Sequence, residues 1–115
     1  GEDLTWSVSV PGNMLGLLLP PLSLQVVLEN AIKHNIVNNS RPLHIDFTAR
    51  ERVLVVSNRL QPRISATRST GLGLKNLTRR YSLISDRLPQ FEVENDHYIA
   101  YLPLINPESD ESSDN

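Results

Sequence analysis

The amino-acid sequence predicts an α+β fold of two layers, in which helices cover one face of a mixed, mostly antiparallel sheet. Two observations predict it: several short segments alternate apolar and polar residues, and two longer segments repeat apolar residues at helical spacing. Their order is strand, helix, hairpin, loop, helix, hairpin. The 115 residues fit one domain with one core, and the absence of cysteine excludes disulfides and thiolate metal sites.

The first strand is expected where Leu4, Trp6, Val8 and Val10 alternate with Thr5, Ser7 and Ser9, the pattern of a half-buried strand. A second strand carries Leu43, Ile45 and Phe47, and the apolar run 53–56 pairs with it as a hairpin after the charged turn 50–52. The final hairpin joins strands at 91–94 and 98–102 through Asn95 and Asp96.

The first helix is predicted from Pro21 to Ile36, because prolines are tolerated in a first helical turn. Its expected core face carries Leu24, Leu28, Ala31 and Ile32, and its solvent face carries Gln25, Glu29 and Lys33. Glu29 and Lys33 have the spacing of an exposed ion pair, although the Lys33 stem can also reach toward Asn30.

Asn30 and His34 lie one turn apart along the edge of that apolar face, with Ser23 and Val27. A buried amide without a partner costs roughly 1–3 kcal/mol, so Asn30 needs one. From the helix alone, two interpretations stay open. Either the two residues satisfy each other or a loop carbonyl, or they serve a ligand.

The second helix begins near Leu72 and places Leu74, Leu77, Tyr81, Ile84 and Leu88 on one face. The preceding segment, 58–71, has no periodicity, and a loop of that length in a compact domain is usually functional or mobile.

The net charge of −2 is unevenly distributed. Residues 106–115 hold four of the thirteen acids and no base, so residues 1–105 carry nine acids against eleven bases, about +2. The tail has no apolar residues to bury after Asn106 and is expected to be disordered. A core this weakly basic does not indicate a nucleic-acid partner. No apolar run reaches the ~18 residues of a membrane span, and no signal peptide is visible.

Glycines mark the start of the second helix, in the segment Ser69-Thr70-Gly71-Leu72-Gly73-Leu74-Lys75-Asn76. Glycine lets backbone amides approach a ligand closely, and a helix N-terminus favours anions. The segment is not a dinucleotide fingerprint, because the third glycine is missing, and it is not a P-loop, because Gly-Lys-Ser/Thr is absent. Taken alone, it indicates no more than a helix start shaped by glycine.

Three segments in register resemble the GHKL ATP-binding fold (Bergerat fold, HATPase_c) of LytS-like sensor histidine kinases. They are Leu19-Pro-Pro-Leu-Ser-Leu-Gln25, Leu28-Glu-Asn-Ala-Ile-Lys-His34 and Gly71-Leu-Gly-Leu-Lys-Asn-Leu-Thr-Arg-Arg-Tyr81. The closing Tyr98-Ile-Ala-Tyr-Leu-Pro103 is similar to the family's last strand. The resemblance covers residues 3–105 as one catalytic domain, followed by the acidic tail 106–115.

The resemblance implies a Mg·ATP site. Asn30 is then the Mg²⁺ ligand through its side-chain oxygen, Lys33 neutralises phosphate charge, and His34 packs near the ribose or adenine. Gly71, Leu72, Gly73 and Leu74 present backbone amides to the phosphates, with Thr70 close by. The segment 58–70 is then a short ATP lid, and its Arg59, Arg63 and Arg68 are either phosphate contacts or ordinary solvated charges.

Two positions depart from the family's pattern. The usual Asp-x-Gly-x-Gly is replaced by Asn58-Arg59-Leu60-Gln61, so Asn58 takes the place of the adenine-binding Asp. Its amide oxygen still accepts a hydrogen bond, but a weaker one than a carboxylate accepts. The alternative for Asn58 is a turn residue that ends a strand. Val26 occupies the place of the general-base Glu of GHKL ATPases, which argues for phosphoryl transfer rather than hydrolysis.

The implied function is donation of the γ-phosphoryl group to a histidine on a dimerisation helix that precedes residue 1. None of the three histidines in this sequence is a good acceptor, because His34 belongs to the ATP site and His44 and His97 lie on or beside strands. The whole protein is then a homodimer anchored in the bacterial inner membrane, with this domain in the cytoplasm and a response regulator as its partner. The competing hypotheses are a pseudokinase interaction module and a free-standing GHKL kinase or ATPase.

Overall fold

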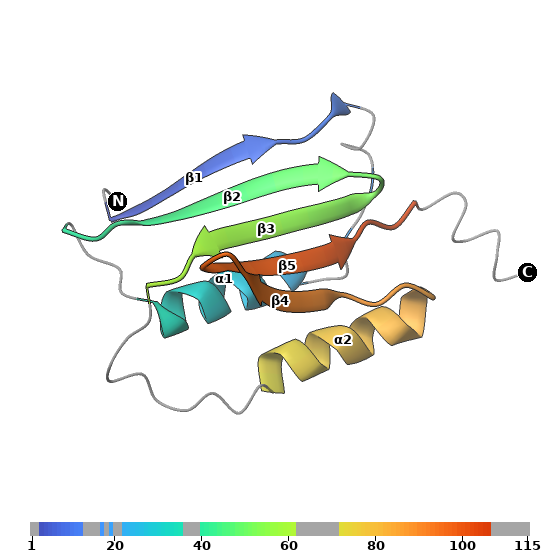
Figure 1. Cartoon of the computed structure of the whole chain (residues 1–115). Coiled ribbons are helices and arrows are strands. Elements are labelled where there is room, and N and C mark those ends of the chain that lie inside the picture. Colours follow the sequence, from blue (N-terminus) through green and yellow to red (C-terminus); the bar gives the residue numbers. More distant parts are fainter. Residues whose placement is uncertain are drawn as a thin grey trace, which may run out of the picture.

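The computed structural model describes residues 3–12, 17, 19, 22–35, 40–61 and 72–106. Figure 1 shows the expected order of strands and helices. The elements are β1 (Leu4–Ser9), α1 (Ser23–His34), β2 (Leu43–Arg50), β3 (Val53–Arg59), α2 (Leu72–Ile84), β4 (Gln90–Glu94) and β5 (His97–Pro103).

The strands form one five-stranded sheet in the order β1-β2-β3-β5-β4. β1 runs parallel to β2, and the other three pairs are antiparallel, so the sheet is mixed and mostly antiparallel, as the sequence predicted. Both hairpins turn through two residues with positive φ, Glu51 and Arg52 in the first and Asn95 and Asp96 in the second. Such turns match the right-handed twist of the paired strands, which fixes their register.

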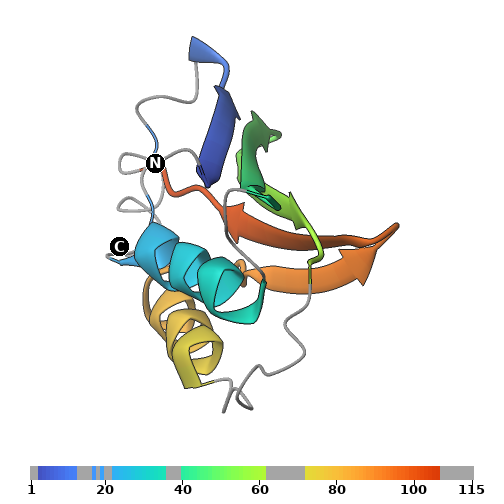
Figure 2. The same ribbon diagram turned by 90° about the vertical axis from the view of Figure 1, so that its left-hand side faces the viewer.

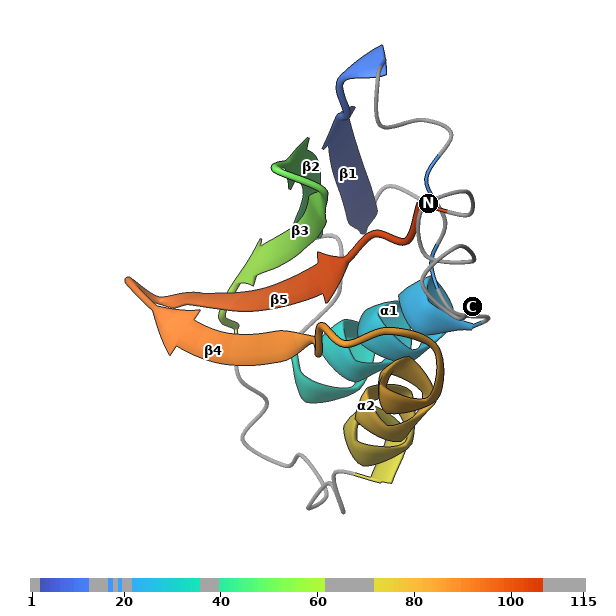
Figure 3. The same ribbon diagram turned by 90° about the vertical axis from the view of Figure 1, so that its right-hand side faces the viewer.

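Both helices lie on the same face of the sheet, so the fold is a two-layer sandwich (Figures 2 and 3). We call the covered side the inner face and the opposite side the outer face. Side chains alternate between the faces along each strand. The core between the layers consists of Val27, Ala31, Leu43, Ile45, Ala49, Leu54, Val56, Leu77, Tyr81, Ala100, Leu102 and Leu104.

Tyr81 ties the two layers together from the middle of α2. Its hydroxyl donates a hydrogen bond to the Pro103 carbonyl at 2.8 Å, and Ser23 at the start of α1 is its neighbour. Burial raises the pKa of this phenol well above its usual range, and the nearby Arg87 lowers it in part. Tyr81 therefore joins α1, α2 and β5 through one neutral hydroxyl.

The buried face of α1 differs from the predicted one. Ser23, Val27 and Ala31 are buried, whereas Leu24 and Ile32, which the periodicity assigned to the core, are exposed. The small side chains of Ser23 and Ala31 allow close packing against the other elements. α1 also begins at Ser23 rather than Pro21, because Leu22 takes a left-handed conformation with φ of 66°. Its end at His34 is two residues earlier than predicted.

The inner face of β1 is also less covered than its alternating pattern indicated. Trp6 is 60% exposed and Val8 is 66% exposed, because β1 lies at the end of the sheet farthest from the helices (Figures 2 and 3). Between this end and α1 lies an open apolar groove of about 400 Å³. It is lined by Trp6, Val8, Val10, Leu24, Leu28, Phe47 and Leu54.

α2 begins at Leu72 as expected but ends at Ile84, so Leu88 lies beyond the helix and is exposed. In the part of the chain that the structure describes, no helix is long and apolar enough to cross a bilayer. Of the expected tail, only Asn106 is described. The domain bounds 3–105 therefore stay a prediction.

Candidate functional site

Asn30 contacts the sheet from the partly buried edge of α1. Burial raises the pKa of the Tyr98 phenol on β5, and the neighbouring Asn30 side chain lowers it in part. The sequence left open whether Asn30 is satisfied by His34 or a loop carbonyl, and in the structure Tyr98 is its neighbour on the sheet. The backbone of His34 ends α1, and its side chain lies outside the described residues.

Asn58 lies on the inner face near the end of β3 and is only 3% exposed. It pairs in register with Ile45 on one side and Tyr98 on the other, so the interpretation as a turn residue is wrong. Its Nδ2 donates to the Arg59 carbonyl at 3.0 Å, which directs the amide nitrogen toward the backbone. The carboxamide oxygen consequently lies on the other side of the group, where it suits an amino-group donor.

Asn30, Tyr98 and Asn58 thus form a connected polar group between α1 and the sheet. Asn30 neighbours Tyr98, and Tyr98 pairs directly with Asn58 on the adjacent strand. Sequence reasoning missed Tyr98 as a member of this group. The signal was available, because Tyr98 alternates with the buried Ala100 and Leu102 and so belongs to the inner face.

Asn35 is a second functional-site neighbour that the sequence did not single out. It is 2% exposed and follows α1 directly, and its Oδ1 accepts the Gln61 amide N–H at 2.7 Å. The Leu60 amide N–H also donates a hydrogen bond to the Asp96 carbonyl at 2.8 Å. These contacts fix the point where the chain leaves β3 and enters the predicted lid.

The start of α2 lies against α1 one turn before Asn30. A Cβ placed on Gly73 would lie 3.6 Å from Val26 Cγ1, which is ordinary van der Waals contact. Gly73 therefore needs to be glycine neither for packing nor for a left-handed φ. The first turn of α2, which contains Leu72, Gly73 and Leu74, has no acidic residue at the positive end of the helix dipole. Thr70 and Gly71 lie outside the described residues.

Lys33 on α1 is exposed, and Arg59 at the end of β3 is exposed and alternates with Asn58, so it belongs to the outer face. Among the described residues Lys33 forms no ion pair with Glu29, which instead accepts a hydrogen bond from Gln25 Nε2 at 3.0 Å. The interpretation of Glu29 and Lys33 as an ion pair is therefore wrong. Arg63 and Arg68 lie outside the described residues, so their predicted phosphate contacts stay a prediction.

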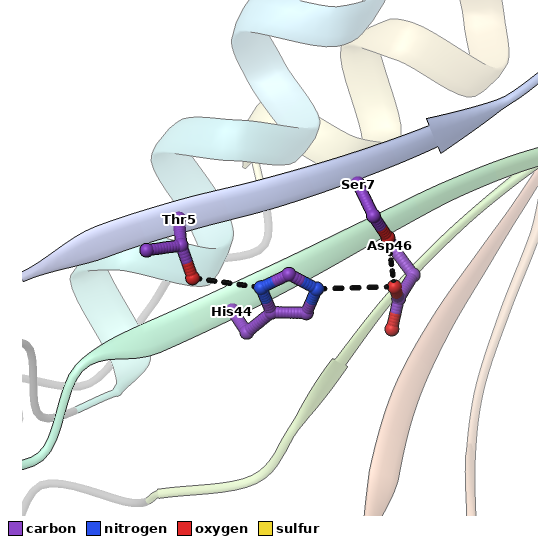
Figure 4. Close-up of polar contacts among 4 residues, drawn as sticks. All are labelled: Thr5, Ser7, His44 and Asp46. Atoms are coloured by element: carbon purple, nitrogen blue, oxygen red, sulfur yellow. Dashed lines mark hydrogen bonds and ion pairs between the residues drawn. The ribbon is translucent and has the colours of Figure 1, made fainter.

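His44 lies on the outer face, opposite the helices, in a polar cluster that crosses β1 and β2 (Figure 4). Its Nδ1 lies 2.7 Å from Thr5 Oγ1 and its Nε2 lies 3.2 Å from Asp46 Oδ1, which also accepts a hydrogen bond from Ser7. His97 begins β5, and its Nδ1 is 2.9 Å from the Asn95 carbonyl. Neither histidine belongs to the Asn30 group.

The residues around Asn30 fit Mg²⁺ only together with another ligand. The Asn30 oxygen is a hard donor, but the described residues contain no group of three or more His, Cys, Asp or Glu side chains that could hold a metal. Magnesium commonly keeps several waters and binds through one or two protein oxygens plus substrate phosphates. The site therefore fits a metal bridged by a nucleotide, rather than a metal held by protein alone.

Comparisons with known proteins identify the fold. No family model and no curated protein matches the sequence. A search of solved structures finds the Acinetobacter baumannii histidine kinase AdeS, with a TM-score of 0.54 and 14% identity over 90% of this chain. The match covers 55% of the AdeS chain, so this chain spans about half the length of that structure. The two-layer sandwich predicted from the sequence is thus a histidine-kinase-like fold.

Proposed function

We propose that this chain is the ATP-binding catalytic domain of a LytS-like sensor histidine kinase. It binds Mg·ATP and presents the γ-phosphoryl group to a histidine on a dimerisation helix outside this sequence. One observation carries the proposal: Asn30, Asn58 and Gly73 lie on one side of the sandwich. Tyr98, near the start of β5, neighbours Asn30 on α1 and pairs with Asn58 near the end of β3, and Gly73 at the start of α2 lies against α1.

Each group has a chemical role in this proposal. The Asn58 oxygen accepts the adenine amino group, and the Asn30 oxygen contributes to the magnesium shell. The amides of Leu72, Gly73 and Leu74, at an α2 N-terminus without acids, suit the phosphates. Lys33, exposed on α1, adds positive charge beside Asn30. Bound magnesium neutralises charge on the phosphates, and the chain's own residues position the nucleotide.

The proposal assigns phosphoryl transfer rather than hydrolysis. Val26 lies one turn before Asn30 and beside Gly73, and its side chain has no group that can accept a proton from water. His44 is a poor internal acceptor because it lies on the outer face. The acceptor histidine, the homodimer, the inner-membrane anchor and the response regulator belong to the proposal for the whole protein.

A calorimetric titration of the domain with ADP or a non-hydrolysable ATP analogue, with magnesium or with EDTA, tests this function. We expect binding that magnesium strengthens. Asn30→Ala should lose the magnesium-dependent part and keep the magnesium-free part. Gln25→Ala is the matched control, because Gln25 is exposed on the same helix and, among the described residues, donates to the exposed Glu29. An Asn30→Ala variant that behaves like Gln25→Ala would remove Asn30 from the metal site.

A second candidate function is a pseudokinase module that binds a protein partner without nucleotide. Asn58 favours it, because a neutral amide at the adenine position binds more weakly than a carboxylate. The same titration separates the two candidates. No heat of binding up to millimolar nucleotide supports the pseudokinase and contradicts the kinase domain.

A further inference from the structure

β1 is an end strand of the sheet, and among the described residues it has a strand partner on one edge only, β2. The Asp3 carbonyl just before β1 accepts the Leu43 amide N–H at 2.9 Å and therefore points toward β2. Backbone groups point to alternate edges along a strand. Those of Leu4, Trp6 and Val8 consequently point to the edge that faces away from β2, where an added strand can pair with them.

This outer edge of β1 lacks the usual protection of an end strand. Natural proteins protect such strands with charged side chains and prolines, which disfavour pairing with another chain. β1 is six residues long and contains neither a charged residue nor a proline. The strand at the other end of the sheet, β4, carries Glu92 and Glu94. The sequence therefore protects one end of the sheet and leaves the other suited to pairing.

The two faces of β1 differ in polarity. On the inner face, Trp6 is 60% exposed and Val8 is 66% exposed, and both line the apolar groove beside α1. On the outer face, Thr5 and Ser7 belong to the polar cluster around His44 (Figure 4). A strand that covers this edge should therefore present apolar residues on the inner face and small polar residues on the outer face. β1 itself has this pattern.

We propose that β1 pairs with the β1 of a second copy of this chain, antiparallel about a two-fold axis at Ser7. In this register each Trp6 lies opposite the partner's Val8, and each Thr5 lies opposite the partner's Ser9. Apolar residues of both copies then share the inner face, and hydroxyl residues share the outer face. Trp6 and Val8 form the hydrogen-bonded pairs, because their backbone groups point to this edge. Aromatic and β-branched residues are favourable cross-strand neighbours.

A second copy suits this edge in charge as well as in pattern. The pairing brings no like charges of the strands together, because β1 has none, and it places the apolar grooves of the two copies on the same side of one continuous sheet. One strand pair is a small interface, so we expect weak association, with a dissociation constant of about 0.1–1 mM. The pairing requires neither nucleotide nor the dimerisation helix of the proposed function.

Sedimentation equilibrium of this chain at up to millimolar concentration, without nucleotide, tests the pairing. Val8→Lys should weaken self-association at least about tenfold, because the interface would have to desolvate an ammonium group. Val93→Lys is the matched control, since Val93 is 63% exposed on the inner face of the other end strand and should change nothing. A monomer at millimolar concentration, or equal association of the two variants, would overturn the inference.

Disulfide formation tests the register, because the chain has no cysteine of its own. The proposed axis places the two copies of Ser7 opposite each other in a non-hydrogen-bonded pair, with Cα atoms about 4.5 Å apart, within the reach of a disulfide. Under mild oxidation Ser7→Cys should therefore form a linked dimer. Ser9→Cys should form far less, since each Ser9 lies opposite Thr5. Equal yields from the two variants would contradict this register.

The inference and the proposed function fail separately. Val8 takes no part in the proposed nucleotide site, so Val8→Lys should bind Mg·ADP as the wild type does. A chain that binds Mg·ADP and stays monomeric would overturn this inference and leave the proposed function standing. A dimer that Val8→Lys dissociates, in a chain that binds no nucleotide, would support this inference and contradict the proposed function.

Discussion

Asn35 and Gln61 join the end of α1 to the chain just beyond β3. The Asn35 Oδ1 accepts the Gln61 amide N–H at 2.7 Å, while its Nδ2 donates to the Ala31 carbonyl at 2.7 Å. One buried side chain thus caps the last turn of the helix and holds a residue 26 positions away. The distance between the proposed metal ligand on α1 and the beginning of the predicted lid depends on this link.

Asn35→Leu should destabilise the domain strongly. It removes both bonds and leaves a partly buried Gln61 N–H without this acceptor, at a cost of about 1–3 kcal/mol. Urea unfolding followed by circular dichroism measures the change. Gln25→Leu is the control, because it loses only an exposed contact within one helix turn. Equal unfolding free energies for the two variants would show that Asn35 is not a structural link.

The element order and the sheet were predictable from the sequence because their signals are local. The Arg50–Arg52 and Asn95–Asp96 turns separate strands of clear alternation, and their pairing follows from the short connections. The prediction of a mixed, mostly antiparallel sheet with helices on one face is confirmed. Helix bounds were less accurate, since Leu22 adopts a left-handed conformation that no local pattern indicates.

The buried face of α1 could not be derived from its own periodicity. Leucines on two sides of the helix satisfy a helical pattern, and only the rest of the fold decides which side is covered. The apolar face of β1 shows the same limit, because Trp6 alternates correctly yet lies beyond the helices. At the site, Asn30 and Asn58 came from the family resemblance, whereas Tyr98 and Asn35 act through contacts between distant segments.

Asn58→Asp should strengthen adenine nucleotide binding and weaken the fold. A carboxylate accepts a hydrogen bond roughly twice as strong as a neutral amide does, so we expect up to about tenfold tighter ADP binding. The variant also buries a charge at a 3% exposed position, so its melting temperature should fall. Calorimetry and thermal unfolding measure the two effects. Tighter binding of GDP than of ADP would contradict the assignment of Asn58 to the adenine amino group.

Gly73→Ala tests whether Gly73 is needed for stability or for nucleotide binding. The new Cβ makes an ordinary contact with Val26, and alanine favours a helix over glycine, so stability should rise by about 0.5–1 kcal/mol. Nucleotide affinity should nevertheless fall, because the methyl group hinders close approach of the phosphates to the α2 amides. Unfolding and binding are measured on the same preparation. Unchanged affinity in a stabilised variant would remove Gly73 from the phosphate site.

Tyr81→Phe should lower the unfolding free energy by removing the neutral phenol that joins the two layers. Losing the bond to the Pro103 carbonyl should cost about 1–2 kcal/mol at pH 8. Burial raises the folded-state pKa of Tyr81, so its contribution is complete below the unfolded tyrosine pKa of about 10 and is lost as the pH rises above it. The stability difference between wild type and variant should therefore shrink by about 1 kcal/mol between pH 10 and 11. If the difference in unfolding free energy between wild type and Tyr81→Phe stays constant over this pH range, the pKa of Tyr81 is not raised in the folded state.

In the proposed function, nucleotide binds between α1, the end of β3, the start of β5 and the start of α2. The most direct test is an amide chemical-shift titration of the ¹⁵N-labelled domain with Mg·ADP. We expect the largest changes at Asn30, Asn58, Gly73 and Tyr98, with the outer-face cluster around His44 unchanged. Changes confined to the apolar groove or the outer face, or none at millimolar nucleotide, would contradict it.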